Sequence, residues 1–410
     1  MSSSPYISLP QIPQSLDKET KEYLTALTKI LTDKQKDDFS VLESFEKRIT
    51  FSNNIFFFNY FDRITINPQN NNQIIIPAFR INIQNEILIL ENSYILSTSD
   101  LINETNYEFG KDYYIFAGKA ITNLNSKSPV FKVSKTTTQP SDLKNPVIIG
   151  GFHYGKVRKS ITPSDVSNGI VPNSVWDLNH MPRCYLLGLQ DPANYQIGGM
   201  VEVIKNKLWV DIYLASHGGG SGFNRKVVSK INQLPLTGTE GLNWFDFVIR
   251  AGNVGKRMLT YAEWTQAAIG SPQGLNDSNL HGWTKTSNTR KVKTAATNAA
   301  DADANYILGY NTSLLNVRDC VGNVWEWLAD VSNRHDSTSW AWHNVLDAGE
   351  LAASQDFGQA FLPNDYGMVA LIAGGNWGIG VIAGARAVAV GSYPWIVDAG
   401  GGCRFACENI

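Results

Sequence analysis

The spacing of hydrophobic residues changes along the chain, and each spacing predicts a different kind of structure. Near the N-terminus apolar residues recur at helical intervals, at Leu16, Tyr23, Leu24, Leu27, Ile30 and Leu31. Ser15 precedes this stripe as a potential N-cap, so the pattern predicts a helix from Leu16 to about Asp33, with an extension towards Ile49. The stripe fits a helix packed on its own domain and equally an oligomerising helix, and both interpretations stay open.

Residues 51–146 show the spacing of β-structure. Short β-branched or aromatic runs alternate with turns rich in Asn, Gly and Ser, at 64–66, 73–76, 86–90, 113–116 and 130–133. The segment Asn67–Asn72 is expected to form a turn or an exposed loop. Several short strands at this spacing predict a small β-sandwich or prism.

From Val147 the pattern becomes mixed. Strand-like pieces at 147–156, 174–184 and 208–215 are joined by long irregular stretches, and helices are expected at 243–251 and 261–268, before a polar loop at 270–305. The fold class is therefore α+β. We expect three parts: an extended segment and helix at 1–50, a β-rich part at 51–146, and a domain of mixed structure at 147–410.

The last forty residues combine residues typical of a structural framework, which we call the frame, with small or aliphatic residues between them. The frame consists of Gly374–Trp377, Gly384, Arg386, Pro394, Gly402 and Arg404. Between Gly378 and Gly402 the remaining residues are almost all Gly, Ala, Val and Ile. A core strand would alternate larger residues, and an ordinary loop would carry Asp, Asn and Ser. The pattern instead indicates a fixed scaffold with interchangeable side chains, as a variable binding surface requires.

Net charge and amino-acid composition argue against some classes of binding partner. The net charge of -2 gives no electrostatic basis for binding nucleic acid or an anionic membrane. The N-terminal residues lack the basic and apolar segments of a signal peptide, and no apolar stretch approaches the roughly 20 residues that span a bilayer. We therefore expect synthesis in a cytoplasm, no membrane insertion and no nucleic-acid partner. The 11 Trp and 34 Gly residues with only 18% charged residues suit a loop-rich fold held by aromatic anchors.

Candidate chemical groups are few. Four cysteines do not make a disulfide scaffold, and Cys403 and Cys407 either pair or pack as thiols, with packed thiols favoured. The Gly-rich segment 217–226 lacks the spacing of a phosphate-binding loop, so a flexible loop is expected. Carboxylates that could bind Ca²⁺ are more simply explained by helix capping and pairing with arginines, at Asp319, Glu326 and Asp330. We expect no metal, no cofactor and no catalytic residue.

The order of several motifs marks a fold family. Leu259–Ala268, Gly322–Trp327, Gly374–Trp377 and the two Gly-x-Arg pairs at Arg386 and Arg404 together resemble the C-type lectin-like domain of the formylglycine-generating enzymes. The resemblance implies a core built on buried tryptophans at Trp325, Trp327 and Trp377. The planar donor arrays of Arg386 and Arg404 would then bind carbonyls and carboxylates.

A closer resemblance is to the variable proteins of diversity-generating retroelements, the family of the phage major tropism determinant. It covers residues 147–410 and rests on Ile149–Gly155, Ser174–Leu178, Trp209–Leu214, Arg257–Trp264, Pro394 and the C-terminal frame. In that family a reverse transcriptase rewrites adenines in the C-terminal coding segment, mainly in Asn codons. The resemblance implies that 51–146 is an adaptor and 147–410 the ligand-binding domain, with a variable region at 374–407. The matched positions would be Gly378, Gly380, Val381, Ile382, Ala389, Gly391, Ser392, Ile396, Asp398 and Gly400.

The resemblance implies a non-enzymatic function. Side chains at the matched positions, with Tyr393 and Trp395 as larger contacts, would bind a host-surface receptor (protein or glycan) at the tip of a phage tail fibre. Tyrosine and tryptophan commonly dominate binding energy. The relatives also imply a homotrimer attached to other tail or baseplate proteins, and display of several copies would raise weak affinity.

Two alternatives come from other classes. One is a structural tail or cell-surface protein whose glycine-rich end packs against a fixed partner. The other is an oxidase of the formylglycine-generating type, whose paired copper-binding cysteines would lie near 381–387. This chain has no cysteine there, and its six histidines show no metal-ligand spacing. The sequence therefore favours the binding protein.

Overall fold

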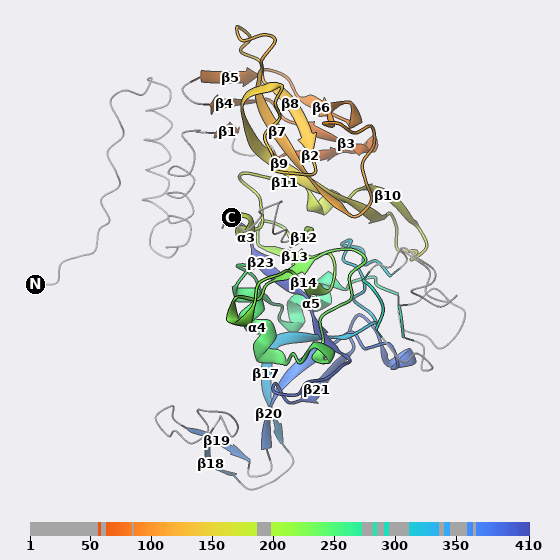
Figure 1. The fold of residues 1–410 in the computed structure, drawn as a ribbon. Helices are drawn as coiled ribbons and strands as arrows, with labels where there is room; N and C mark the ends of the chain where they lie inside the picture. The colour runs from red at the N-terminus through yellow and green to blue at the C-terminus, as the bar shows by residue number, and fades with distance from the viewer. Residues whose placement is uncertain are drawn as a thin grey trace, which may run out of the picture. The chain divides into compact units, whose positions relative to one another are not determined.

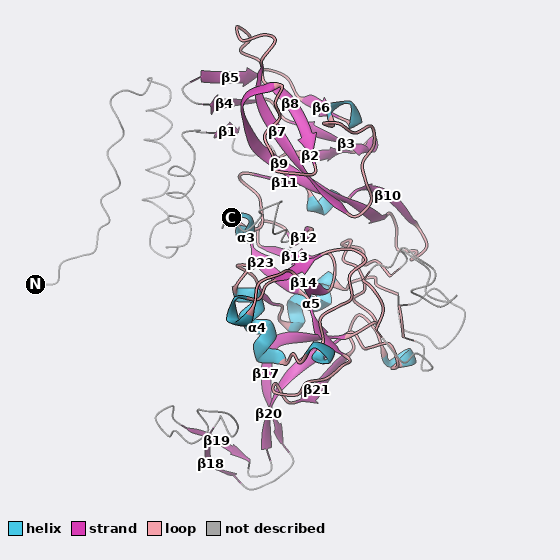
Figure 2. Ribbon diagram, viewed as in Figure 1, coloured by secondary structure: helices cyan, strands magenta, loops and turns pink. Residues whose placement is uncertain are grey.

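The computed structural model describes residues 56–58, 63–83, 86–186, 198–272, 282–284, 291–294, 311–335, 340–344, 359–363 and 366–410. Its contacts divide the chain into two units, residues 1–56 with 81–87 and residues 57–80 with 88–410. The predicted N-terminal helix and the polar loop at 270–305 lie largely or wholly outside the described residues. Strands dominate the described part, with few helices between them (Figure 2).

The most N-terminal of the described strands belongs to a three-stranded sheet. Its strand order is β1-β4-β5, with bounds Phe56–Phe58, Phe79–Ile83 and Glu86–Leu90 (Figure 1). The run at 86–90 therefore forms the strand that its β-branched residues predict.

The β-rich part of the second unit begins with a small sheet of order β2-β3-β6, at Thr65–Asn67, Asn70–Ile76 and Tyr94–Leu96. The expectation of a loop at Asn67–Asn72 was wrong for most of the segment. Only residues 68 and 69 form a turn, and Asn70 already pairs with Asn67 across the hairpin. Asn67 stabilises the turn because its Oδ1 accepts the backbone N–H of Gln69 at 3.0 Å.

A larger antiparallel sheet completes the β-rich part. Its order is β10-β9-β7-β8, with β11 pairing on β9, and the bounds are Val166–Ile170, Leu143–Arg158, Lys111–Ala120, Val130–Ser134 and Trp176–Asp177. Aromatic rings fill its inner face, and the rings of Tyr113 and Phe152 stack with centroids 5.4 Å apart. Two short 3₁₀ turns flank these strands, η1 at Thr98–Asp100 and η2 at Pro172–Ser174.

The predicted domain boundary between residues 146 and 147 falls inside β9. This strand pairs with β7 on both sides of that point, from Ala120 opposite Leu143 to Lys111 opposite Tyr154. A domain boundary normally lies where few contacts cross. We therefore propose that the β-rich domain continues through β11 and that the next domain begins after it.

The C-terminal domain is built on two four-stranded sheets. The first has the order β12-β13-β23-β16, at Met200–Ile204, Leu208–Asp211, Phe405–Glu408 and Arg257–Met258. The second has the order β21-β20-β17-β22, at Val388–Ser392, Tyr366–Ala373, Trp325–His335 and Gly401–Cys403. Two hairpins accompany them: β14 and β15 at Ala215–His217 and Val227–Ser229, and β18 and β19 at Trp340–Asn344 and Gln359–Pro363.

The described helices of the C-terminal part are short. Among the described residues the α-helices are α3, α4 and α5, at Arg183–Leu186, Trp244–Gly252 and Tyr261–Ala267. Further 3₁₀ turns are η3, η4 and η7, at Gly222–Asn224, Gly238–Glu240 and Gly380–Ile382. Both helices predicted for this domain are confirmed within a residue or two. Each begins with a capping box, from Asn243 to Asp246 and from Thr260 to Glu263.

The cap of α4 gives a direct test of this local account. Asn243→Ala removes the acceptor for the backbone N–H of Asp246, so we expect the free energy of unfolding to fall by about 1 kcal/mol. Asn243→Ser, which keeps a capping oxygen, should stay within about 0.5 kcal/mol of the unmodified protein. Urea denaturation measures both, and equal losses in the two variants would contradict the capping role.

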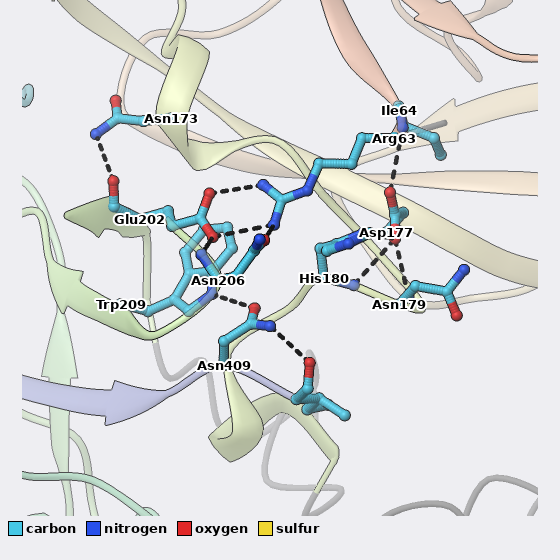
Figure 3. A network of polar contacts seen from close by, with 11 residues as sticks. Arg63, Ile64, Asn173, Asp177, Asn179, His180, Glu202, Asn206, Trp209 and Asn409 are labelled. Atoms are coloured by element: carbon cyan, nitrogen blue, oxygen red, sulfur yellow. Dashed lines mark hydrogen bonds and ion pairs between the residues drawn. The ribbon is translucent and has the colours of Figure 1, made fainter. Parts of the chain in front are cut away.

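A polar network joins the β-rich part to the C-terminal domain within the second unit (Figure 3). The Arg63 guanidinium donates to both carboxylate oxygens of Glu202, at 2.7 and 3.1 Å, and also to Asn206. Buried Asp177 accepts the backbone N–H of Ile64 at 3.1 Å. Bidentate pairs of this kind fix geometry as well as contributing energy, so the network fixes how β2 and β11 meet the β12–β13 hairpin.

Candidate functional site

The Gly322–Trp327 motif organises the base of the site. Gly322 and Asn323 adopt positive φ values of 79° and 64°, which turn the chain sharply before β17. The Asn323 side chain accepts the N–H of Val292 at 2.9 Å and donates to its carbonyl at 3.0 Å, while its own carbonyl accepts the N–H of Trp377 at 3.1 Å. One asparagine thus holds an irregular loop and the start of the predicted variable region.

Arg404 is the central cation of the domain and is buried, at 1% exposure. Its guanidinium donates to both oxygens of buried Glu326, at 3.0 and 3.2 Å, and to the carbonyls of Asp211, Ile212 and Arg318. Burial raises the pKa of the Glu326 carboxyl above its ordinary value, and the adjacent guanidinium opposes that shift. Arg404 therefore ties β22 and β23 to β17 and to the chain after β13.

Backbone hydrogen bonds anchor the segment between Gly374 and Gly402 at many points. The N–H of Gly380 donates to the Thr284 carbonyl at 2.7 Å, and the carbonyl of Pro394 accepts the N–H of Trp244 at 3.0 Å. The Asp398 carbonyl accepts the N–H of Gly238 at 2.9 Å. These partners belong to the frame outside the segment, so the path of its backbone does not depend on its own side chains.

The predicted ligand-binding side chains differ in exposure. Those that are exposed are Val381, Ile382, Gly391, Trp395, Ile396 and Asp398; those of intermediate exposure are Gly378, Ala389, Ser392 and Tyr393. Gly380 and Gly400 are buried, and Gly380 has φ +60°. Most of the predicted positions therefore present a side chain to solvent, and these two glycines serve the backbone instead. Whether each position varies stays a prediction.

Seven large apolar side chains are exposed within this segment, and we call them the apolar patch. They are Val381, Ile382, Val388, Val390, Trp395, Ile396 and Val397, with exposures from 37% to 67%. The patch includes three residues that the sequence analysis did not select: Val388, Val390 and Val397. Strand alternation is the signal that finds the first two, because they flank half-buried Ala389 on β21.

Tyr393 and Trp395 form the aromatic part of the surface. Their rings are stacked, with centroids 5.2 Å apart and planes 10° from parallel. Trp395 is 45% exposed, whereas Tyr393 is half-buried. Tyr393 therefore supports the indole of Trp395 from one side and leaves its other side to solvent.

The predicted scaffold residues do not all behave alike. Trp325 and Trp327 are buried, as expected, at 8% and 2% exposure. Trp377 is only half-buried, so the expectation of a third buried tryptophan was wrong. Arg386 is exposed, and it is its backbone carbonyl that accepts the Tyr261 hydroxyl at 2.8 Å. A scaffold role for its guanidinium stays a prediction.

The cysteines are buried and free, including Cys403 and Cys407, which favours packed thiols over a Cys403–Cys407 bridge. Burial raises the pKa of the Cys403 thiol well above its ordinary value, and the Cys403 Sγ donates to the carbonyl of Trp327 at 3.4 Å. The thiolate, and not the thiol, is the form that acts as a nucleophile or binds a metal. Because the raised pKa keeps Cys403 in the thiol form, we interpret Cys403 as a packed core residue.

The other groups considered as ligand sites have structural partners. Asp330 accepts the N–H of Tyr261 at the start of α5, Asp319 accepts an Asn311 amide N–H, and Glu326 pairs with Arg404. Within the described ranges no group of three or more His, Cys, Asp or Glu side chains is placed to hold a metal ion. The Gly-rich segment 217–226 closes the β14–β15 hairpin, with the N–H of Lys226 donating to the Gly219 carbonyl.

Comparisons with known proteins agree with this architecture. Residues 77–177 match a family model described as the Mtd second domain, and residues 198–395 match one described as the Sulfatase-modifying factor enzyme 1-like domain. No curated protein matches the chain. Among the described residues no helix is long and apolar enough to cross a membrane.

Three solved structures have the same fold: the U1, M1 and P3c variants of the Major Tropism Determinant. Each is 18% identical, covers 87% of this chain and gives a TM-score of 0.59. The shares of those chains that are covered are 86%, 85% and 86%. The predicted resemblance to the Major Tropism Determinant is confirmed at the level of the fold and by the family model at residues 77–177. The fold class, a C-type lectin-like domain of the formylglycine-generating type after a small β-rich domain, is confirmed as well.

Proposed function

We propose that this chain is the receptor-binding protein at the tip of a phage tail fibre, and the variable protein of a diversity-generating retroelement. It binds a host-surface ligand non-covalently through the exposed side chains between Gly378 and Gly400. The observation that carries the proposal is that the backbone of this segment is anchored while its side chains are exposed. Its backbone is bonded to fixed elements at Thr284, Trp244 and Gly238, while its side chains form the solvent-exposed apolar patch. Side chains can then change without changing the fold.

The chemistry of the patch favours an apolar ligand surface. Exposed apolar patches on soluble proteins mark sites of interaction, and here Asp398 and Arg386 are the exposed charged side chains between residues 378 and 400. A protein receptor with a complementary apolar surface fits this composition better than a glycan, which offers mainly hydroxyl groups for hydrogen bonding. The proposed partners also include other copies of this chain, as a homotrimer, and further tail proteins. Several linked copies would raise a weak single-site affinity.

The proposal is non-enzymatic. It is supported by the burial of Cys403, by its raised thiol pKa and by the carboxylates already paired or capping in the frame. The direct test is the DNA that follows the codon for Ile410. A near-copy of the segment encoding Gly374 to Cys407, differing at adenines and accompanied by a reverse transcriptase gene, is the expected result. Without such a copy, a structural protein with a fixed partner would replace the proposal.

Trp395 is expected to dominate binding. Trp395→Ala removes the largest exposed side chain of the patch and should weaken binding to cells of the natural host about 30-fold, which corresponds to about 2 kcal/mol. Tyr393→Ala should weaken it less, because Tyr393 acts by supporting the Trp395 ring. Flow cytometry with labelled protein measures the apparent affinity.

The matched control is Ile161→Ala, since Ile161 is 81% exposed and lies in the β-rich part. This variant should bind host cells within about twofold of the unmodified protein. Unchanged affinity in the Trp395 variant, with its melting temperature preserved, would contradict a binding role for this surface.

A further inference from the structure

Two cysteines from distant parts of the chain meet in the core of the C-terminal domain. Cys184 lies on α3 and Cys407 on β23, and their sulfur atoms are 3.3 Å apart. Both residues are fully buried, and the Sδ of Met200 lies 3.6 Å from the Cys184 sulfur. The other two cysteines have different surroundings: Cys403 faces the Trp327 and Arg404 carbonyls, and Cys320 lies beside Ser271.

We propose that Cys184 and Cys407 form a disulfide when the protein meets an oxidising environment, and that this bond staples α3 to β23. A disulfide needs a sulfur–sulfur distance of about 2.05 Å, so the two atoms must approach by roughly 1.3 Å. Rotation about the side-chain torsions supplies part of that movement, and the short helix α3 supplies the rest by shifting on β23. The inference concerns only the frame and does not depend on the proposed ligand.

The position of the bond determines its effect. It joins residues 223 positions apart, and the loop that it closes contains both sheets of the domain and the whole variable segment. Closing so long a loop restricts the unfolded chain strongly. β23 lies between β13 and β16 and directly follows β22 and the variable segment. The disulfide would therefore fix β23, the strand that follows the segment carrying the apolar patch.

The chemistry is ordinary thiol–disulfide exchange with a small disulfide such as oxidised glutathione. One cysteine thiolate attacks a sulfur of the oxidant, forms a mixed disulfide and releases one glutathione thiolate. The second cysteine thiolate then attacks the mixed disulfide and releases the other. The two cysteine protons end on two molecules of reduced glutathione, so the protein pair is oxidised and the oxidant reduced.

Burial makes this oxidation slow in the native state. It raises the pKa of the Cys184 thiol well above its ordinary value, so little reactive thiolate forms near neutral pH. Reaction then requires local opening of α3 and should accelerate with rising pH. In a reducing cytoplasm the pair stays reduced, and the bond forms only after the protein leaves it.

Peptide mapping tests the bond directly because trypsin places each cysteine on a separate peptide. The expected fragments are 184–205, 319–334, 387–404 and 405–410. Full-length protein is incubated with oxidised glutathione or with dithiothreitol, free thiols are alkylated, and the digest is analysed by mass spectrometry. We expect a cross-link between 184–205 and 405–410 only after oxidation, and an increase in melting temperature of about 5–10 °C.

Cys407→Ser should abolish both the cross-link and the oxidant-dependent increase in melting temperature. Cys403→Ser is the matched control and should keep both. A Cys403–Cys407 link, a link between molecules, or four free thiols after prolonged oxidation at alkaline pH would overturn the proposal. So would a correct link with an unchanged melting temperature. If either variant fails to fold, the peptide map of the unmodified protein still decides the question.

Discussion

Replacing Arg404 by alanine is expected to lower the free energy of unfolding by about 3–5 kcal/mol, the largest loss that we predict for one substitution in the frame. The substitution leaves the carboxylate of Glu326 buried without its partner. It also removes the donors for the carbonyls of Asp211, Ile212 and Arg318. Urea or thermal denaturation measures the loss, and aggregation on expression would agree with it.

A lysine variant separates the charge of Arg404 from its shape, and an alanine variant at an exposed ion pair serves as its control. Arg404→Lys keeps a cation but lacks the planar fork that reaches three carbonyl groups and a carboxylate together, so an intermediate loss is expected. Lys132→Ala is the control for an exposed pair, because Lys132 and Asp142 are 27% and 52% exposed. Its effect should be below about 1 kcal/mol. A similarly small loss for Arg404→Ala would show that the buried pair is not central to the frame.

Sequence patterns correctly predicted the helices and strands that are determined by residues within the same segment. Helix α4 begins at the capping box that its sequence displays, and the β-branched runs became strands. The turn at Asn67 was predicted too long, because its extent depends on the pairing of Asn70 across the hairpin. The boundary at 146 was placed inside β9 for a similar reason. A strand of 16 residues is defined by partners on β7 and β10 that lie far away in the sequence.

In the candidate site, too, sequence patterns predicted some features and missed those that depend on distant parts of the chain. Motif order identified the frame: Trp327 is buried as expected, and the Arg404 guanidinium donates to a carboxylate and to backbone carbonyls as expected. Trp377 is half-buried and Arg386 is exposed, and the motifs that contain them do not determine the burial of a side chain. Val388 and Val390 were not among the positions matched to the family, whereas their exposure follows from alternation on β21. Periodicity therefore adds information that motif matching lacks.

Glycines in the segment should fall into two classes when a side chain is added. Gly374 has φ +90°, and a Cβ there would lie 2.4 Å from the carbonyl oxygen of Cys320. Gly374→Ala combines left-handed backbone strain with a clash against main chain, so we expect a loss of at least about 3 kcal/mol. At Gly391 a Cβ would meet nothing within 4 Å, and Gly391→Ala should change stability by less than about 0.5 kcal/mol.

A larger side chain at Gly391 tests the difference between Gly374 and Gly391 more stringently. Gly391→Tyr should remain folded with a nearly unchanged melting temperature, because the position on β21 is exposed and open. It should nevertheless alter binding to host cells, because the variant adds a large aromatic side chain at an exposed position of the proposed ligand-binding segment. Thermal denaturation and cell binding measured on the same preparations separate the two effects. A Gly391 variant that loses stability as Gly374→Ala does would mean that the segment is packed rather than displayed, and the division between fixed backbone and free side chains would be wrong.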